Sequence, residues 1–364
     1  MLIFHPQYRG YYRQASREHR RKILYSALFA CLFMLVVIGG LILLMVQEKQ
    51  SEENYIQEKI TQTHVSLTAD TLGILKKKPV PARVMLISIG DINLKEKQLM
   101  LYLGITLHYK PQQFISDPNF EVVNAVTNNT KLVKQHYNSD GSLDALYLAR
   151  VQIEPYYLMP LYPTDVQLIA LRLAAADMDS DYYIQVTDFQ NYSPEIGDYA
   201  LVKTGYVNQI ESYPINFAES NTSYFNRFSR VYLIYDHQNI LNYLKNIQYI
   251  LLSLGLAVCS LLLNTRKRGP YMERFGLISG AVFALASNIF QINASVKPIS
   301  TFSVIDLISV FTAIVIIGSF FTTLRSIKFA DEDGYETAKS FDVTMFSVLA
   351  TFSILFFILV YLVL

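Results

Sequence analysis

Few residues of this sequence could form a catalytic or metal-binding site, and they are scattered along the chain. His64, His108, His136 and His237 lack the spacing of a metal site, and no phosphate-binding glycine loop or nucleophile elbow occurs. The two cysteines lie within long apolar runs, so we expect neither a disulfide nor a thiol-ligated metal. We therefore expect no enzyme activity and no cofactor, because a reactive site should gather titratable residues in one cleft.

A set of polar residues inside an apolar segment is more informative. The run Phe275–Ala294 contains Ser279, Ser287, Asn288, Gln291 and Asn293. Polar side chains are expensive in contact with lipid, so these residues should face protein or water. Steps of four and three residues define one helix face, and on it lie Gly276, Gly280, Phe283, Ser287, Phe290 and Ala294.

The Gly276-x-x-x-Gly280 spacing also fits a different arrangement. Small residues four positions apart let two membrane helices pack closely, which would leave both phenylalanines in lipid. The sequence leaves both readings of this face open.

The elements that position these residues are apolar helices. A membrane-crossing helix needs about 20 apolar residues, and five runs qualify: Ile23–Val46, Ile247–Leu262, Phe275–Ala294, Phe302–Leu324 and Phe341–Leu364. Overall, 52% of the residues are hydrophobic and the net charge is +1, which argues against a nucleic-acid partner. The sequence predicts an integral membrane protein in contact with lipid.

Lysine and arginine in the short flanks predict the orientation. Segment 1–22 is basic, and "RKRGPYMER" follows the second run. Because cytoplasmic loops carry the excess of these residues, the N-terminus should lie in the cytoplasm, and region 47–245 and the C-terminus outside it. The run 23–46 is longer than a signal-peptide core and lacks a cleavage pattern, which favours an uncleaved anchor over a cleaved signal peptide.

The outer region divides into a stalk and a β domain. Residues 47–78 are polar with spaced apolar positions and predict a helical stalk, broken by "KKKPVP". Residues 79–245 contain many short β-like runs separated by clusters such as "NNT", "NSDGS" and "AESNTS". This pattern predicts an antiparallel β-sandwich, followed by a four-helix membrane domain at 246–364.

Several local motifs occur in an order that resembles the pentameric ligand-gated ion channels, in particular the bacterial members without the disulfide loop. The segment "ISIGDINLKEKQLMLYLGITLHY" is similar to the first β-hairpin of that family, and "LYPTDVQLIALRL" to its Y-P-F-D loop. "TGYVNQIESY" is similar to a later strand, and "ERFGLISGAVFALASNIFQINASVKPISTFSVID" to the pore helix and the link that follows it.

The resemblance implies a homopentamer in a bacterial inner membrane that conducts ions when an unidentified small molecule binds. It places the stripe of Phe275–Ala294 on the pore axis, with a ring of Phe283 and Phe290 closing the path by dewetting. Glu273 would ring the cytoplasmic mouth and favour cations, an effect opposed by the adjacent Arg274.

The resemblance also implies where a signal is received and passed on. Residues implied to couple the outer domain to the pore are Asp165, Lys297, Pro298, Phe302 and Asp306. Residues implied to bind the ligand between subunits are Tyr206, Tyr213, Tyr224 and Phe225. The competing structural roles are turn capping for Asp165, helix capping for Asp306 and simple coverage of the sandwich for the aromatic rings.

Three departures from the family pattern favour an alternative function. The chain has an N-terminal anchor, its first channel helix "NIQYILLSLGLAVCSLLL" lacks the usual proline, and "IYDHQN" stands where an arginine is expected. The alternative is a non-conducting, membrane-anchored sensor or assembly subunit whose sandwich holds a partner.

Overall fold

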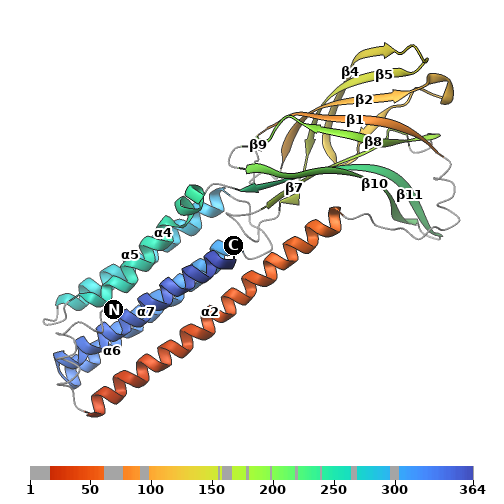
Figure 1. Cartoon of the computed structure of the whole chain (residues 1–364). Coiled ribbons are helices and arrows are strands. Elements are labelled where there is room, and N and C mark those ends of the chain that lie inside the picture. Colours follow the sequence, from red (N-terminus) through yellow and green to blue (C-terminus); the bar gives the residue numbers. More distant parts are fainter. Residues whose placement is uncertain are drawn as a thin grey trace. The chain divides into compact units, whose positions relative to one another are not determined.

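The structure is a computed structural model, which Figure 1 shows as a whole. It describes residues 17–60, 77–90, 98–154, 156–157, 166–177, 180–196, 199–217, 220–237, 240–263, 269–295 and 303–363. The chain divides into two compact units, a helical unit (1–51, 159–164 and 240–364) and a sandwich unit (52–158 and 165–239).

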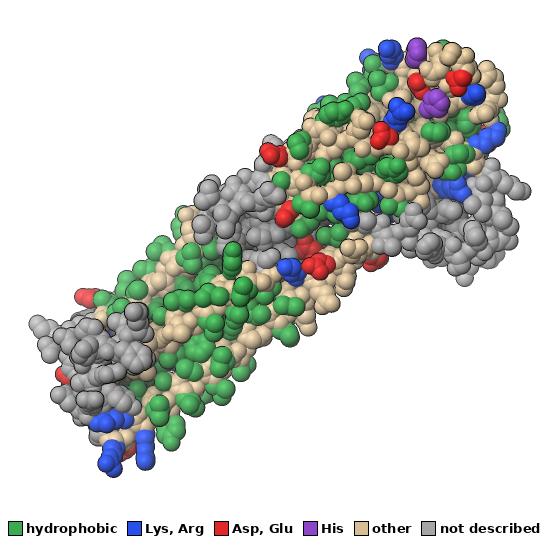
Figure 2. All heavy atoms as spheres, viewed as in Figure 1, with side chains coloured by type: hydrophobic (Ala, Val, Ile, Leu, Met, Phe, Trp, Pro, Cys, Tyr) green, Lys and Arg blue, Asp and Glu red, His purple; other side chains and the backbone are tan. Residues whose placement is uncertain are grey.

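The helical unit contains the predicted membrane spans. Its elements are α2 (Arg17–Ile60), α4 (Ile240–Cys259), the short 3-10 helix η3 (Ser260–Leu262), α5 (Gly269–Ser295), α6 (Val304–Glu332) and α7 (Tyr335–Val363). Helices α2, α5, α6 and α7 are long and apolar enough to cross a membrane, and Ile247–Leu262 is a shorter apolar helix. In Figure 2, many hydrophobic side chains lie on the visible face of these helices. The sequence therefore located the apolar helices correctly.

Helix α6 is the most buried of the four long helices. Its threonine hydroxyls are satisfied within the helix, because Thr312 donates to the carbonyl of Ile308 at 2.9 Å, Thr322 to that of Gly318 at 2.7 Å and Thr323 to that of Ser319 at 3.0 Å. Gly334, with φ of 87°, makes the tight turn into α7, since a positive φ suits glycine. The rings of Phe311 and Phe356 then stack across α6 and α7 with centroids 4.0 Å apart.

The first 35 residues of α2 belong to the helical unit. One face of the helix is buried in the apolar core through Ile23, Met34, Ile38, Leu41 and Met45. Near its start, His19 Nε2 lies 2.6 Å from Asp333 Oδ1 in the α6–α7 turn. Near its other end, the Lys49 ammonium donates to the carbonyl of Val363 at 2.7 Å. Contacts along the whole segment thus make α2 a member of the bundle.

The sandwich unit consists of two sheets. The first has strand order β4-β5-β2-β1-β8 and the second β3-β7-β11-β10-β9, with β6 paired to β7. Their bounds are β1 (Lys78–Ile89), β2 (Leu99–Tyr109), β3 (Phe120–Val122), β4 (Ala125–Tyr137), β5 (Leu143–Ile153), β6 (Tyr156–Tyr157), β7 (Val166–Ala175), β8 (Tyr182–Asn191), β9 (Glu195–Ile196), β10 (Tyr199–Phe217) and β11 (Ser220–His237). Alternate residues of both sheets, such as Leu103, Ile105, Leu171 and Leu233, form one buried core between them.

The prediction of a purely antiparallel sandwich is wrong at one pair of strands, because β1 runs parallel to β8. Two prolines at the start of β1, Pro79 and Pro81, fit this pairing. The amide of Lys78 donates to Asp181 of the incoming β8 segment at 2.9 Å, so by alternation the proline nitrogens point away from β8. On the other side of β1, pairing with β2 begins only at Ala82. The proline nitrogens, which cannot donate a hydrogen bond, therefore face no partner strand.

One predicted turn is also wrong. Asn128–Thr130, expected as an exposed turn, lies within β4, a 13-residue edge strand whose side chains are almost all exposed. A strand that covers no core needs no alternation of apolar residues, so the sequence gives no strand signal there. The other turn, "NSDGS", is confirmed: Gly141 has φ of 78° and Asn138 donates to Ser142 across the hairpin at 2.8 Å. In "AESNTS", β11 already begins at Ser220.

The segment predicted as a helical stalk is helical as far as Ile60, where α2 ends. Its residues from Glu52 onward belong to the sandwich unit. Tyr55 and Ile56 pack on Leu168, Tyr232 and Ile234, which project from the outer face of the second sheet. The end of α2 therefore covers a patch of that sheet.

Candidate functional site

Helix α5 carries the residues predicted to line a pore. One of its faces is covered by the rest of the chain: Ile278, Ala281 and Leu285 are buried, at helical steps of three and four. On the neighbouring α4, the Ser253 hydroxyl donates to the carbonyl of Ala281 at 2.6 Å, and Leu256 lies next to Gly280. These contacts determine which face of α5 stays uncovered.

The predicted stripe lies on the uncovered side of α5. Phe283 is 74% exposed and Phe290 76% exposed, and Glu273, Gly276 and Ser287 are also exposed. Gly280 is half-buried against α4, and the side chain of Ala294 is outside the described residues. The described part of the chain thus leaves this stripe uncovered.

The polar residues of α5 divide between its two sides. Ser279, Ser287 and Gln291 are exposed, whereas Asn288 is buried and its Nδ2 has no hydrogen-bond partner among the described residues. In a helix apolar enough to cross a membrane, exposed polar groups are unfavourable against lipid. The uncovered face of α5 is therefore better suited to protein or water than to acyl chains.

A buried ion pair fixes the beginning of α5 to α7. The guanidinium of Arg274 donates to both carboxylate oxygens of Asp342, at 3.0 and 2.6 Å, and both side chains are fully buried. The same guanidinium donates to the carbonyls of Leu261 and Leu263 at 3.3 and 2.7 Å. The orphan carbonyls that follow α4 are thereby satisfied.

This ion pair was not found from the sequence, in which Arg274 was only a charge opposing Glu273. The sequence did contain an indication of this pair in Asp342, because an acidic residue inside an apolar span usually has a partner. The structure turns Arg274 inward against Asp342 and leaves the neighbouring Glu273 exposed.

The residues predicted to bind a ligand lie on the β10–β11 hairpin. Tyr213 and Tyr224 are register partners, and Phe225 pairs with Ser212 one position away. Tyr206 lies seven residues before Tyr213, is 40% exposed, and donates from its hydroxyl to the carbonyl of Thr187 at 2.8 Å. The backbone register therefore brings three of the four residues together and holds Tyr206 apart from them.

Most of the predicted coupling residues lie outside the described part of the chain: Asp165, Lys297, Pro298 and Phe302. Asp306 is described, and it caps α6. Its carboxylate accepts from the amide of Ser303 at 2.9 Å, while the Ser303 hydroxyl accepts from the amide of Asp306 at 3.3 Å. This reciprocal arrangement is a capping box, so the capping alternative for Asp306 is confirmed.

Within the described residues, no group of three His, Cys, Asp or Glu side chains is arranged to hold a metal ion. A scan against models of protein families and a search of curated proteins found no match to this chain.

Proposed function

We propose that this chain is a subunit of an oligomeric membrane channel similar to the pentameric ligand-gated ion channels, with α5 lining the pore. The observation that carries the proposal is the uncovered face of α5, on which Ser279, Ser287 and Gln291 are exposed together with Phe283 and Phe290. In a ring of subunits this face would border water, where its polar groups stay hydrated and its aromatic rings narrow the path.

The buried ion pair supports cation preference in such a channel. Arg274 is neutralised by Asp342 and points away from the uncovered face, so it does not oppose an exposed ring of Glu273. Rings of carboxylates at a pore mouth attract cations.

The sandwich would supply the sensor. Ligand binding near Tyr213 and Tyr224 would shift a closed–open equilibrium through different affinity for the two states. Aromatic rings suit a cationic small molecule at such a site.

Reconstitution tests the proposal directly. Purified chain in liposomes should produce ion flux, and single-particle imaging should show closed rings of five copies. Absence of flux from rings of this kind would reject conduction, whereas monomers without flux would reject the oligomer as well.

Cysteine accessibility tests the assignment of the pore-lining helix. The native Cys31 and Cys259 are free and at least partly exposed, so both must first be replaced by alanine. In that background, Phe283→Cys and Ser287→Cys should react with a water-soluble thiol reagent, and Leu285→Cys on the buried face is the matched control. Modification of Leu285→Cys alone would show that α5 is oriented differently.

A second candidate is a non-conducting, membrane-anchored sensor or assembly subunit. It is favoured by the contacts of Tyr55 and Ile56 at the end of α2 with the outer face of the second sheet, since an anchor serving a sensor would engage the sensor domain. For this function, liposomes that contain the purified chain would show no ion flux.

A further inference from the structure

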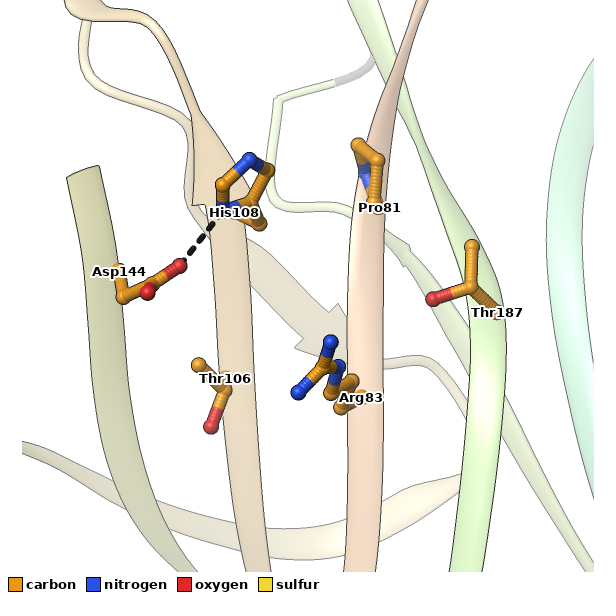
Figure 3. A pocket seen from close by; sticks show the side chains of 6 residues that line it. All are labelled: Pro81, Arg83, Thr106, His108, Asp144 and Thr187. Atoms are coloured by element: carbon orange, nitrogen blue, oxygen red, sulfur yellow. Dashed lines mark hydrogen bonds and ion pairs between the residues drawn. The ribbon is translucent and has the colours of Figure 1, made fainter. Parts of the chain in front are cut away.

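A polar cavity lies on the outward face of the first sheet, on the side of the strands away from the core. It has a volume of about 260 Å³ and is lined by Pro81, Arg83, Thr106, His108, Asp144 and Thr187, which come from four adjacent strands (Figure 3). This volume is slightly below the range of about 300–1,000 Å³ typical of ligand pockets, so an occupant must be small.

The pairing of the strands brings these side chains together. Arg83 is the register partner of Thr106 on β2, and His108 is the register partner of Asp144 on β5. Directly paired residues have side chains on the same face of a sheet. Residues far apart in the sequence thus converge on one patch.

A bulge in β8 supplies the fourth wall. Ala82 pairs with Val186 and Arg83 with Asp188, which leaves Thr187 as an extra residue on β8. A bulge re-aims a side chain and is frequent beside functional sites. Here the Thr187 side chain borders the cavity while its carbonyl accepts from the hydroxyl of Tyr206.

The charged side chains of the cavity differ in the hydrogen bonds that they already make. His108 Nδ1 lies 2.6 Å from Asp144 Oδ1, and Asn138 Nδ2 donates to Asp144 Oδ2 at 3.0 Å. Burial acts to raise the pKa of Asp144, but these hydrogen bonds, together with the positive charge of the nearby Arg83, prevail and lower it, so the carboxylate stays ionised. The guanidinium of Arg83, by contrast, makes no hydrogen bond or ion pair with any described residue, and in Figure 3 it points toward the space between β1 and β2.

We propose that this cavity binds a small monocarboxylate, held by Arg83 and by the hydroxyl of Thr106, while the Thr187 hydroxyl donates to the carbonyl of Ala82 at 3.3 Å and forms part of the wall. A guanidinium presents a planar pair of donors that matches a carboxylate, and the Thr106 hydroxyl can donate to one of the same oxygens. Phosphate fits less well, because its higher charge would be repelled by the nearby carboxylate of Asp144 while only one permanent positive charge attracts it.

Ligand-observed saturation-transfer NMR on the full chain in detergent tests this inference, with propionate as the probe. The expected result is saturable transfer to propionate, with a dissociation constant raised about tenfold or more in Arg83→Gln, because a charge-assisted hydrogen bond is lost. Thr106→Val should weaken binding by a smaller factor, because it removes one neutral hydrogen bond. Binding does not require conduction, so this test is independent of the proposed channel function.

Arg150→Gln is the matched control. Arg150 is also exposed on the outward face of the first sheet, where it pairs with Tyr102 and its guanidinium lies 5.7 Å from that ring, outside the cavity. This variant should bind propionate as the wild type does. Absence of saturable transfer, equal affinity in Arg83→Gln, or displacement of propionate by an equal concentration of inorganic phosphate would each overturn the proposal.

Discussion

Breaking the ion pair between α5 and α7 should strongly destabilise the helical unit. In Asp342→Asn the shape of the side chain is kept while its charge is removed. The Arg274 guanidinium would then remain buried with only neutral partners, namely the new amide and the carbonyls of Leu261 and Leu263. Removing one partner of a fully buried pair typically costs about 3–5 kcal/mol, because the remaining charge is uncompensated.

The two partners should also be coupled. Both side chains are fully buried and joined by two hydrogen bonds of 3.0 and 2.6 Å, so Arg274→Met removes a donor from an already buried carboxylate. In the double variant Arg274→Met/Asp342→Asn no charge is left unpaired. Its loss of unfolding free energy should therefore be smaller than the sum of the single losses, by about 1–3 kcal/mol.

Unfolding in mixed detergent micelles, followed by far-UV circular dichroism, measures these free energies. The sequence contains no tryptophan, so tryptophan fluorescence is not an option. Glu273→Gln is the control, since Glu273 adjoins Arg274 but is exposed. The reasoning fails if Asp342→Asn unfolds like this control, or if the two single losses simply add.

Three further predictions concern other parts of the fold. Alanine at Gly205 would place its Cβ 2.5 Å from the hydroxyl of Tyr232, so Gly205→Ala should destabilise the sandwich by about 1–3 kcal/mol. The melting temperature in thermal unfolding should recover when Tyr232→Leu is added. Burial raises the pKa of Tyr235 to about 12, despite the hydrogen bond from Asn191. The folded-state pKa lies above the unfolded value of about 10. The contribution of the Tyr235 hydroxyl to the free energy of unfolding is therefore complete below pH 10 and is lost as the pH rises toward 12. The stability of the wild type relative to Tyr235→Phe should therefore fall over this range, and a constant difference in chemical unfolding experiments would contradict the assignment. Ser303→Ala and Asp306→Ala should each cost about 1 kcal/mol of α6 stability. Because the two caps are reciprocal, the double variant should lose less stability than the sum of the two single losses. Additive losses would argue against the capping box.

The sequence located elements wherever burial leaves a periodic or continuous apolar signal. The long helices were visible because a bilayer requires an apolar run, and β1, β2, β5 and β7 because each has residues that alternate toward the core. Strand β4 gave no such signal, since an exposed edge strand is held by its ladder to β5 and not by burial. The parallel pairing of β1 with β8 was not visible either, because strand direction depends on chain connections that alternation does not encode.

Much the same limit applies to the candidate sites. The uncovered stripe of α5 could be predicted because its residues share one helix, where steps of three and four define a face. The pair Arg274–Asp342 spans 68 positions and the pair His108–Asp144 spans 36. No local pattern brings such residues together, so these contacts emerge only when the helices and strands are assembled.

The contacts of α2 with the rest of the bundle have a consequence for how the protein is made. This helix is synthesised early, yet the carbonyl that receives the Lys49 ammonium lies 314 positions later in the chain. At the usual rate of translation of about 5–20 residues per second, roughly 15–60 s pass before that partner exists. Until then the buried face of α2 lacks the contacts that α7 supplies, and an apolar face of this kind needs cover from lipid or from another protein. The bundle can close around α2 only after α7 has been synthesised.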